Sequence, residues 1–224
     1  MLIMEKEFRL VEIAGRLALQ ALHRPNLNSL FIDLDSEEKK YRLKTSSRSD
    51  PLIKALGKSG KNVFDATFGL GNDALTMLRH GYAVEASERS PMLVALWEDA
   101  IKHLSVNAKL RKIILENLKL FQQDAKTYLK NIKSIPDIIY LDPMYPKKKK
   151  SSLQRKEMLL LRELVGEDKD SHELFQLAKT RAKDRVVVKR PLPAPAVAED
   201  VSYTVKANTV RFDVYLIEKK TSQK

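Results

Sequence analysis

The stretch DATFGLGND, residues 65–73, decides the fold of this chain. It lies between an apolar, β-branched run that predicts a strand over residues 62–68 and a helical pattern over residues 73–80. Gly69 and Gly71 let the backbone turn tightly and approach a ligand closely, and the helix that follows presents unpaired N–H groups. The stretch therefore predicts a ligand-binding turn, although a glycine turn between a strand and a helix is also common without a ligand.

An acidic residue ends the next predicted strand, which covers residues 83–88. Glu88 lies 23 residues after Asp65, and a carboxylate there can accept hydrogen bonds from both hydroxyls of a ribose. The nicotinamide fingerprint Gly-x-Gly-x-x-Gly fails, because Ala74 occupies its third glycine position. An acidic residue four positions before the first glycine instead suits S-adenosyl-L-methionine, whose cationic sulfonium and ammonium groups favour a carboxylate. We therefore expect this cofactor to bind at residues 65–73 and Glu88.

Asp124 follows the third predicted strand, over residues 118–123. Its carboxylate can accept a hydrogen bond from an adenine amino group, although an aspartate that begins a helix is also an ordinary N-cap. Asp65, Glu88 and Asp124 thus fall at the ends of three consecutive strands. Because doubly wound sheets bind ligands beyond the carboxyl ends of their strands, we expect all three carboxylates at one site.

The turn Asp142-Pro143-Met144-Tyr145 follows an apolar strand predicted over residues 136–141. An Asp-Pro-x-aromatic turn after the fourth strand is typical of methyltransferases that modify the exocyclic amines of bases. An aryl amine is a poor nucleophile because its lone pair is delocalised, and a carboxylate at Asp142 can accept its N–H bonds and aim the lone pair. Pro143 stiffens the turn, and Tyr145 can stack on an extruded base. A proline turn that merely ends a strand is the alternative.

Short apolar strands alternate with helical segments from residue 62 onward, which predicts a mostly parallel, doubly wound α/β sheet. Ser90 and Pro91 suit the N-cap and the first position of the helix after the second strand. The end of the chain reads as a hairpin formed by residues 201–206 and 211–217. The other predicted elements are helices from Pro91 to about Leu104 and over residues 125–132, 155–165 and 172–182, and a strand over residues 185–189.

The first fifty residues differ from the rest, and we expect them to form a small N-terminal cap. Their apolar spacing predicts a helix over residues 7–22, followed by short extended runs at 29–34 and 40–44. Residues 51–224 are then expected to form the main Rossmann-like domain.

Composition excludes several classes of protein. The 224 residues contain no cysteine, which rules out disulfides, thiolate zinc sites and methyl transfer through a cysteine adduct. The four histidines show no metal-ligand spacing, so we expect no metal. No apolar run approaches the roughly 18 residues that span a membrane, and the N-terminal residues do not resemble a signal peptide. We expect a cytoplasmic protein with no membrane partner.

Basic residues outnumber acidic ones by 41 to 29, a net charge of +12. Residues 143–224 hold 19 basic and 11 acidic side chains, which favours a polyanionic partner over a merely solvated surface. We expect the proline-rich segment 191–195 to form an ordered loop over the site. The residues expected to contact RNA phosphates are Lys147, Lys148, Lys149, Lys150, Arg155, Lys156, Lys189 and Arg190.

Two other features are better explained by structure than by function. Gly57-Lys58-Ser59 resembles the end of a phosphate-binding loop, but Leu52 stands where the first glycine should be and no strand precedes it. Trp97 lies on the apolar stripe of the helix that begins at Pro91, so we expect it in the core.

At these residues the chain resembles the RsmJ-type family of bacterial methyltransferases, which modify the N2 amine of guanine in small-subunit (16S) ribosomal RNA. The resemblance covers residues 29–217 and is most specific at YLDPMYPKKKKS (140–151), where Met144 replaces the second proline of the generic Asp-Pro-Pro-Tyr turn. The other matching segments are DATFGLGNDA (65–74), ER (88–89), KEM (156–158), VVVKRP (186–191) and RFDVY (211–215).

The resemblance implies a class I S-adenosyl-L-methionine-dependent methyltransferase fold, a seven-stranded sheet with an antiparallel C-terminal hairpin. It implies direct in-line methyl transfer to guanine N2, with 16S rRNA or the small ribosomal subunit as partner. The cofactor contacts that it implies are Asn72, Asp73, Glu88, Arg89, Asp124, Ala125 and Asp142.

The chain departs from this family's pattern in two places. It reads TSSRSD at residues 45–50, where the family often has a glycine-rich stretch, and its N-terminal region is short. Both departures concern RNA docking rather than the chemistry. The residues alone leave open a DNA or tRNA amine methyltransferase and a non-catalytic RNA-binding module with the same fold, and they do not indicate an oligomeric state.

Overall fold

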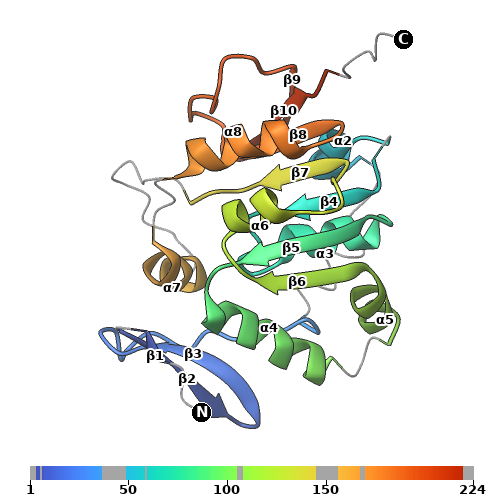
Figure 1. Cartoon of the computed structure of the whole chain (residues 1–224). Coiled ribbons are helices and arrows are strands. Elements are labelled where there is room, and N and C mark those ends of the chain that lie inside the picture. The colour runs from blue at the N-terminus through green and yellow to red at the C-terminus, as the bar shows by residue number, and fades with distance from the viewer. Residues whose placement is uncertain are drawn as a thin grey trace.

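A seven-stranded sheet runs through the centre of the computed structural model, in the strand order β6-β5-β4-β7-β8-β10-β9 (Figure 1). The structure describes residues 4–5, 7–36, 49–58, 60–104, 108–144, 156–166 and 170–218. The strands of this sheet are β4 (Asn62–Asp65), β5 (Ala83–Glu88), β6 (Leu118–Gln122), β7 (Ile138–Leu141), β8 (Arg185–Pro191), β9 (Tyr203–Lys206) and β10 (Val210–Leu216).

Strand β4 is the third strand in this order and pairs in parallel with β5 on one side and with β7 on the other. The chain adds β5 and β6 in one direction and β7 and β8 in the other, so the strand order reverses at β4. Ligand crevices open at such a reversal, beyond the carboxyl ends of the strands. The glycine turn within residues 65–73 leaves this end of β4 and therefore lies at the reversal.

The last strand, β10, pairs antiparallel with both β8 and β9. The predicted C-terminal hairpin and the mostly parallel α/β sheet are thus confirmed. The strands and helices predicted after residue 62 occur within a few residues of their expected bounds.

Helices cover both faces of the sheet (Figure 1). Because neighbouring side chains on a strand point to opposite faces, Ile138 packs with the helices of one face and Ile139 with those of the other. The first face carries α2 (Pro51–Leu56), α3 (Asn72–Arg79), α4 (Pro91–His103), α5 (Ala108–Asn117) and side chains of α7 (Lys156–Val165). The second carries α6 (Ala125–Asn131) and α8 (Ser171–Arg181). No helix in the described ranges is long and apolar enough to cross a membrane.

The helix predicted over residues 7–22 is wrong, because this segment forms a β-hairpin. Strands β2 (Phe8–Ile13) and β3 (Arg16–Ala21) pair antiparallel, with β1 (Met4–Glu5) on the outer side. Ala14 and Gly15 both have positive φ, 50° and 76°, which is the backbone of a two-residue turn that matches strand twist. On β2, Phe8 and Leu10 are buried while the residue between them is exposed, which is the period of a strand.

The residues after the hairpin also differ from expectation. The extended run predicted at 29–34 forms no strand, and Leu30 makes only an isolated bridge to Leu19 on β3. The run predicted at 40–44 lies outside the described residues.

The hairpin shares its core with the main sheet. Leu19 is fully buried in the same apolar cluster as Trp97 of α4, and the Arg16 guanidinium lies 3.2 Å from Asp99 of α4. His23 and Arg24, just after β3, form ion pairs with Glu163 of α7 at 2.9 and 2.7 Å. The division of the chain at residue 50 stays a prediction.

Two helices were missing from the sequence prediction. Helix α2 begins at Pro51, and the Asp50 side chain caps it by accepting a hydrogen bond from Leu52 N. Helix α5 buries Leu110 and Ile114, which lie four residues apart on one face. The Asp-Pro start of α2 and the four-residue apolar spacing of α5 are both visible in the sequence, but each helix is short and its apolar face is narrow.

The start of α3 depends on the absence of a side chain at Gly71. This residue has φ +65°, and a Cβ atom there would lie 2.1 Å from Trp97 Cζ2 and 2.8 Å from Phe68 Cζ. Trp97 is fully buried, as expected from its place on the apolar stripe of α4. Moving its ring would disturb the close packing of the core and cost free energy. The second glycine of the motif is therefore required by packing as well as by the backbone.

We expect Gly71→Ala to lower the free energy of unfolding by about 2–5 kcal/mol, because left-handed backbone strain and a steric clash add together. Gly81→Ala is the matched control, since Gly81 has φ +84° but nothing within 4 Å of its added Cβ; it should cost only about 1–2 kcal/mol. Urea unfolding of the two variants measures the difference. Equal losses would show that the contact with Trp97 does not matter.

Candidate active site

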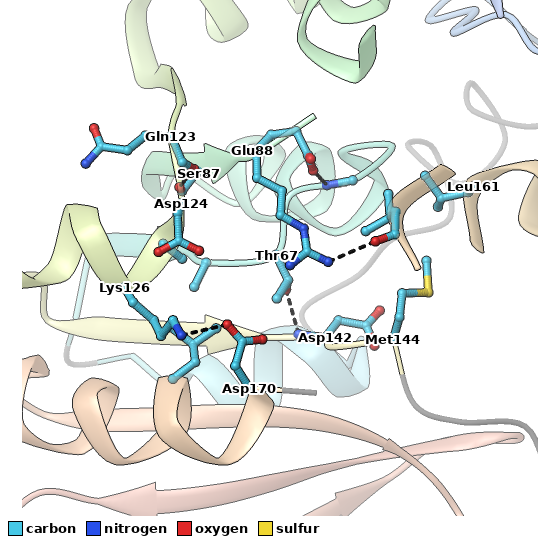
Figure 2. Close-up of a pocket in the computed structure, with 16 residues that line it drawn as sticks. Thr67, Ser87, Glu88, Gln123, Asp124, Lys126, Asp142, Met144, Leu161 and Asp170 are labelled. Atoms are coloured by element: carbon cyan, nitrogen blue, oxygen red, sulfur yellow. Dashed lines mark hydrogen bonds and ion pairs between the residues drawn. The ribbon is translucent and has the colours of Figure 1, made fainter. Parts of the chain in front are cut away.

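A cleft opens beyond the carboxyl ends of β4, β5 and β7, at the reversal of strand order (Figure 2). Six predicted site residues line it: Gly69, Glu88, Arg89, Asp124, Ala125 and Asp142. Its lining also includes residues that sequence reasoning did not assign to a site: Ala66, Thr67, Ser87, Gln123, Lys126, Met144, Leu161, Val165, Asp170 and Leu174. Half of the second group directly precede or follow a predicted site residue, and for these that adjacency was the available signal: Ala66, Ser87, Gln123, Lys126 and Met144.

Glu88 holds the glycine turn against the end of β5. Its Oε2 accepts a hydrogen bond from Gly69 N at 3.0 Å, and its Oε1 accepts one from Ser90 N at 2.8 Å. Each carboxylate oxygen has a second lone pair, so the group can still accept hydroxyl donors from a ligand. Glu88 thus shapes the cleft and lines it at the same time.

Asp124 is both an N-cap and a cleft residue. Its Oδ1 accepts a hydrogen bond from Thr127 N at 3.0 Å, which caps α6. Ala125, the first residue of α6, and Leu174 of α8 add apolar surface beside it. The two readings of Asp124 from sequence are therefore compatible.

Helix α7 closes one side of the cleft with Leu161 and Val165. The Arg89 guanidinium donates a hydrogen bond to the Val165 carbonyl oxygen at 3.0 Å, which ties this wall to the end of β5. Across the cleft, Lys126 pairs with Asp170 at 2.8 Å. The enclosed volume is about 80 Å³.

Asp142 faces the cleft from the end of β7, with 38% of its side chain exposed. Its backbone N–H donates to Thr67 Oγ1 at 2.7 Å, and its Oδ2 accepts a hydrogen bond from Lys189 Nζ at 2.8 Å. Thr67 is in turn fixed by Asp65, whose Oδ1 accepts from Thr67 N at 3.0 Å. The end of β4 and the Asp-Pro turn after β7 are thus joined through Thr67.

A polar network lies behind Asp142. Lys189 of β8 also donates to Asp73 Oδ2 at 2.8 Å, and the Tyr140 hydroxyl donates to the same oxygen at 2.7 Å. Asp65 and Asp73 belong to this network and do not line the cleft. Lys189, expected to contact phosphate, instead bridges two carboxylates.

Other predicted residues lie away from the cleft or beyond the described chain. Arg190 is 6% exposed and donates to the Pro195 carbonyl oxygen, so its guanidinium is held within the protein. The segment 191–195 does not contribute to the cleft lining, contrary to the loop expected over the site. Gly71 and Asn72 also lie outside the lining, and Pro143 is buried. The predicted site residues outside the described positions or side chains are Tyr145, Lys147, Lys148, Lys149, Lys150, Arg155 and Lys156.

Burial controls the protonation of this network. Burial raises the pKa of Asp65 to about 7, against a hydrogen bond from Thr67 that lowers it. Burial also raises the pKa of Asp142, and the Lys189 ammonium opposes that rise. For Lys189 itself, burial lowers the pKa, but Asp73 and Asp142 outweigh it and raise the value. The lysine is therefore a permanent cation at neutral pH.

The chain is a class I S-adenosyl-L-methionine-dependent methyltransferase, because its sheet ends in an antiparallel pair and its cleft begins at the glycine turn of the first parallel strand. Comparison with known proteins agrees. A family described as "Putative SAM-dependent methyltransferase" matches residues 2–217. The chain belongs to this family, within which its curated relatives carry the name ribosomal RNA small subunit methyltransferase J.

Three relatives illustrate the similarity. The protein of that name from Erwinia tasmaniensis is 39% identical over 211 residues, which cover 92% of this chain and 84% of the relative. The one from Coxiella burnetii is 38% identical over 218 residues, 94% and 84% of the two chains. A crystal structure of a SAM-dependent methyltransferase from Neisseria gonorrhoeae superposes with a TM-score of 0.71 at 29% identity, covering 93% and 83%. These matches confirm the resemblance to the RsmJ-type family.

We expect Asp65→Asn to change how stability depends on pH. The native carboxyl has a pKa of about 7 and the ordinary value is 3.8, so the native state binds more protons between these values. The wild-type free energy of unfolding should fall as pH rises from about 4 to about 7 and then level off. The Asn variant keeps an acceptor for Thr67 N and lacks this slope, so it should gain up to about 4 kcal/mol relative to wild type by pH 7.

Urea unfolding of both proteins at several pH values measures this difference. Parallel pH curves for the two proteins would contradict the raised pKa.

Proposed function

We propose that this protein transfers the methyl group of S-adenosyl-L-methionine to the exocyclic N2 amine of a guanine in 16S rRNA of the small ribosomal subunit. The observation that carries the proposal is the placement of Asp142, whose carboxylate faces the cofactor cleft beside the glycine turn. The names of the relatives support small-subunit rRNA as the substrate. Because ribosomal subunits are cytoplasmic, we place the reaction in the cytoplasm.

The cleft residues suit the cofactor chemically. Glu88 would accept the ribose hydroxyls and Asp124 the adenine amino group, with Ala125 and Leu174 against the flat faces of the base. The bound cofactor supplies an electrophilic methyl group. Asp65, Gly71, Asn72 and Asp73 do not line the cleft, and in our proposal they shape the turn rather than contact the cofactor.

In our proposal, the wall formed by α7 moves when the cofactor binds. The enclosed volume of about 80 Å³ is well below the roughly 300–1,000 Å³ of typical small-molecule sites. Leu161 and Val165 occupy the space on this side, and the hydrogen bond from Arg89 to Val165 holds them there. In our proposal, Arg89 exchanges this contact as the cofactor enters.

Asp142 performs the orienting step on the amine. Its carboxylate accepts N–H bonds of the guanine amine, which favours a pyramidal nitrogen and directs the lone pair at the methyl group. The buried Pro143 holds the turn in place. No strong base is needed before transfer, because the amine proton becomes acidic only once the nitrogen carries the methyl. Stacking of the base on Tyr145 completes the proposal and concerns a residue outside the described ranges.

The basic segment after this turn would hold the RNA backbone. Lys147–Lys150, Arg155 and Lys156 follow Asp142 closely in sequence, and phosphate contacts position a nucleic acid without reading its sequence. Lys189 and Arg190 drop out of this group, because both side chains make contacts within the protein.

We expect Asp142→Ala to lower the rate of methyl transfer by roughly 10²–10⁴-fold, while the affinity for S-adenosyl-L-methionine changes only a few-fold. Transfer of labelled methyl groups to small ribosomal subunits from a strain lacking the family's methyltransferase measures the rate, and calorimetry measures the affinity. Glu116→Ala removes a carboxylate from the exposed side of α5 and serves as control.

Undiminished transfer by the Asp142 variant would remove the orienting role. Failure of the wild-type protein to methylate guanine N2 would remove the proposed substrate.

A further inference from the structure

A second cavity lies at the amino ends of β4 and β5, whereas the cofactor cleft lies beyond their carboxyl ends. It encloses about 510 Å³ where β4 and β5 begin, beside α2 and the end of α3. Between these two helices the lining is formed by Gly57, Lys58, Gly60 and Lys61. Ile53 and Tyr82 provide apolar surface, and four basic side chains are the other main part of the lining: Lys54, Lys58, Lys61 and His80. This groove contains the Gly57-Lys58 pair that the sequence left without a role.

The lysines of this groove carry uncompensated charge. Lys54, Lys58 and Lys61 are all exposed, and among the residues that the structure describes none of them forms an ion pair and no carboxylate lines the groove. By contrast, Lys119 and Lys126 on other surfaces each pair with a carboxylate. A concave wall with three unpaired cations attracts an anion.

Close contacts position Gly57, Gly60 and Lys61 in this groove. Gly57 packs so closely on Arg185 that an added Cβ would lie 2.5 Å from its Nη1, and at Gly60 it would lie 2.7 Å from Asp137 Cβ. Asp137 Oδ2 accepts a hydrogen bond from Lys61 N at 3.0 Å.

We propose that this groove binds the phosphodiester backbone of the rRNA substrate, as a second contact remote from the methyl-transfer cleft. The lysines would contact successive phosphates, and the apolar surface of Ile53 and Tyr82 would lie against a sugar or base. The inference rests on the proposed function, since it requires an RNA partner. It predicts that substrate RNA contacts the protein at both the carboxyl and the amino ends of the parallel strands.

The test compares two charge reversals of equal size. Lys58→Glu/Lys61→Glu changes the groove, and Lys102→Glu/Lys109→Glu changes two other exposed lysines, on α4 and α5, by the same net charge. We expect the groove variant to lose at least about tenfold more affinity for 16S rRNA, and its salt slope to be smaller by about 1.5–2. Its affinity for S-adenosyl-L-methionine should equal that of wild type.

Equal losses in the two variants would overturn the groove as a specific site and leave only net charge. If a charge reversal fails to fold, as judged by lost cofactor binding, the alanine versions of the same pairs give the same comparison. Methylation by the wild-type protein, measured separately, decides whether the proposed function itself holds.

A different observation concerns the lysine behind Asp142. The charged and titratable groups around it come from every neighbouring element: Asp65 ends β4, Asp73 lies on α3, Tyr140 lies on β7 and Arg162 lies on α7. Strand β10 presents only Phe212 beside Lys189. Three carboxylates therefore share a small volume, and Lys189 lies 2.8 Å from two of them.

We infer that Lys189 is a positioning residue that keeps Asp142 ionised and fixes the direction of its carboxylate. Lys189 touches Asp142 Oδ2 from behind the turn, so it acts on the substrate only through that carboxylate. Without the ammonium, burial and the nearby Asp73 would favour protonated Asp142, which has lost part of its capacity to accept N–H bonds. The inference deepens the proposed role of Asp142 and rests on it.

Lys189→Met removes the charge and keeps the length of the side chain, and Lys189→Arg restores the charge. In the Met variant we expect the acid limb of the kcat/KM profile to move up by at least about one pH unit, so that activity lost at pH 7 returns at higher pH. The Arg variant should regain most of the wild-type profile. Affinity for S-adenosyl-L-methionine should change little in either.

A uniform loss of activity at every pH would overturn the inference and assign Lys189 a merely structural role. So would an unchanged profile in the Met variant. A wild-type protein that methylates rRNA while Asp142→Ala does not would confirm the function independently of either result.

Discussion

The close contact of Gly71 with the Trp97 ring is the packing constraint on which the start of α3, at the glycine turn, depends. It fixes where α3 begins, and Asp73 on the first turn of that helix then lies within reach of both Tyr140 and Lys189. The same turn brings Gly69 N to Glu88, which defines the cofactor side. A packing constraint in the core is therefore connected, through Asp73 and Lys189, to the Asp142 carboxylate in the cleft.

The electrostatics of the site follow from the closeness of three aspartate carboxylates, Asp65, Asp73 and Asp142. Asp73 and Asp142 both raise the pKa of Asp65, and Asp73 also raises the pKa of Asp142. The Lys189 ammonium lies 2.8 Å from Asp73 and from Asp142 and offsets this repulsion. Asp142 alone of the three faces the cleft. In our proposal, Asp142 acts in the reaction, while Asp65 and Asp73 support the structure behind it.

Much of the fold and the cleft could be predicted from sequence because the signals were local. The glycine turn, the acidic strand ends and the Asp-Pro turn each lie within a few residues of the strand that positions them, and Glu88, Asp124 and Asp142 do meet in one cleft. The helix predicted over residues 7–22 failed because its apolar residues fit either period, and the Ala14-Gly15 turn decided for a hairpin. The contacts of Lys189 with Asp73 and Asp142 were not predicted, because these partners are 116 and 47 residues away and no pattern along a chain reports such pairs.

Helix α7, ten residues long, contacts both the cleft and the N-terminal hairpin. One side supplies Leu161 and Val165 to the cofactor cleft, while Glu163 holds His23 and Arg24 at the end of the N-terminal hairpin. A shift of α7 that widens the cleft also changes the geometry of those ion pairs. The proposed movement of α7 would therefore couple cofactor binding to docking of the hairpin, and each would change the free energy of the other by the same amount.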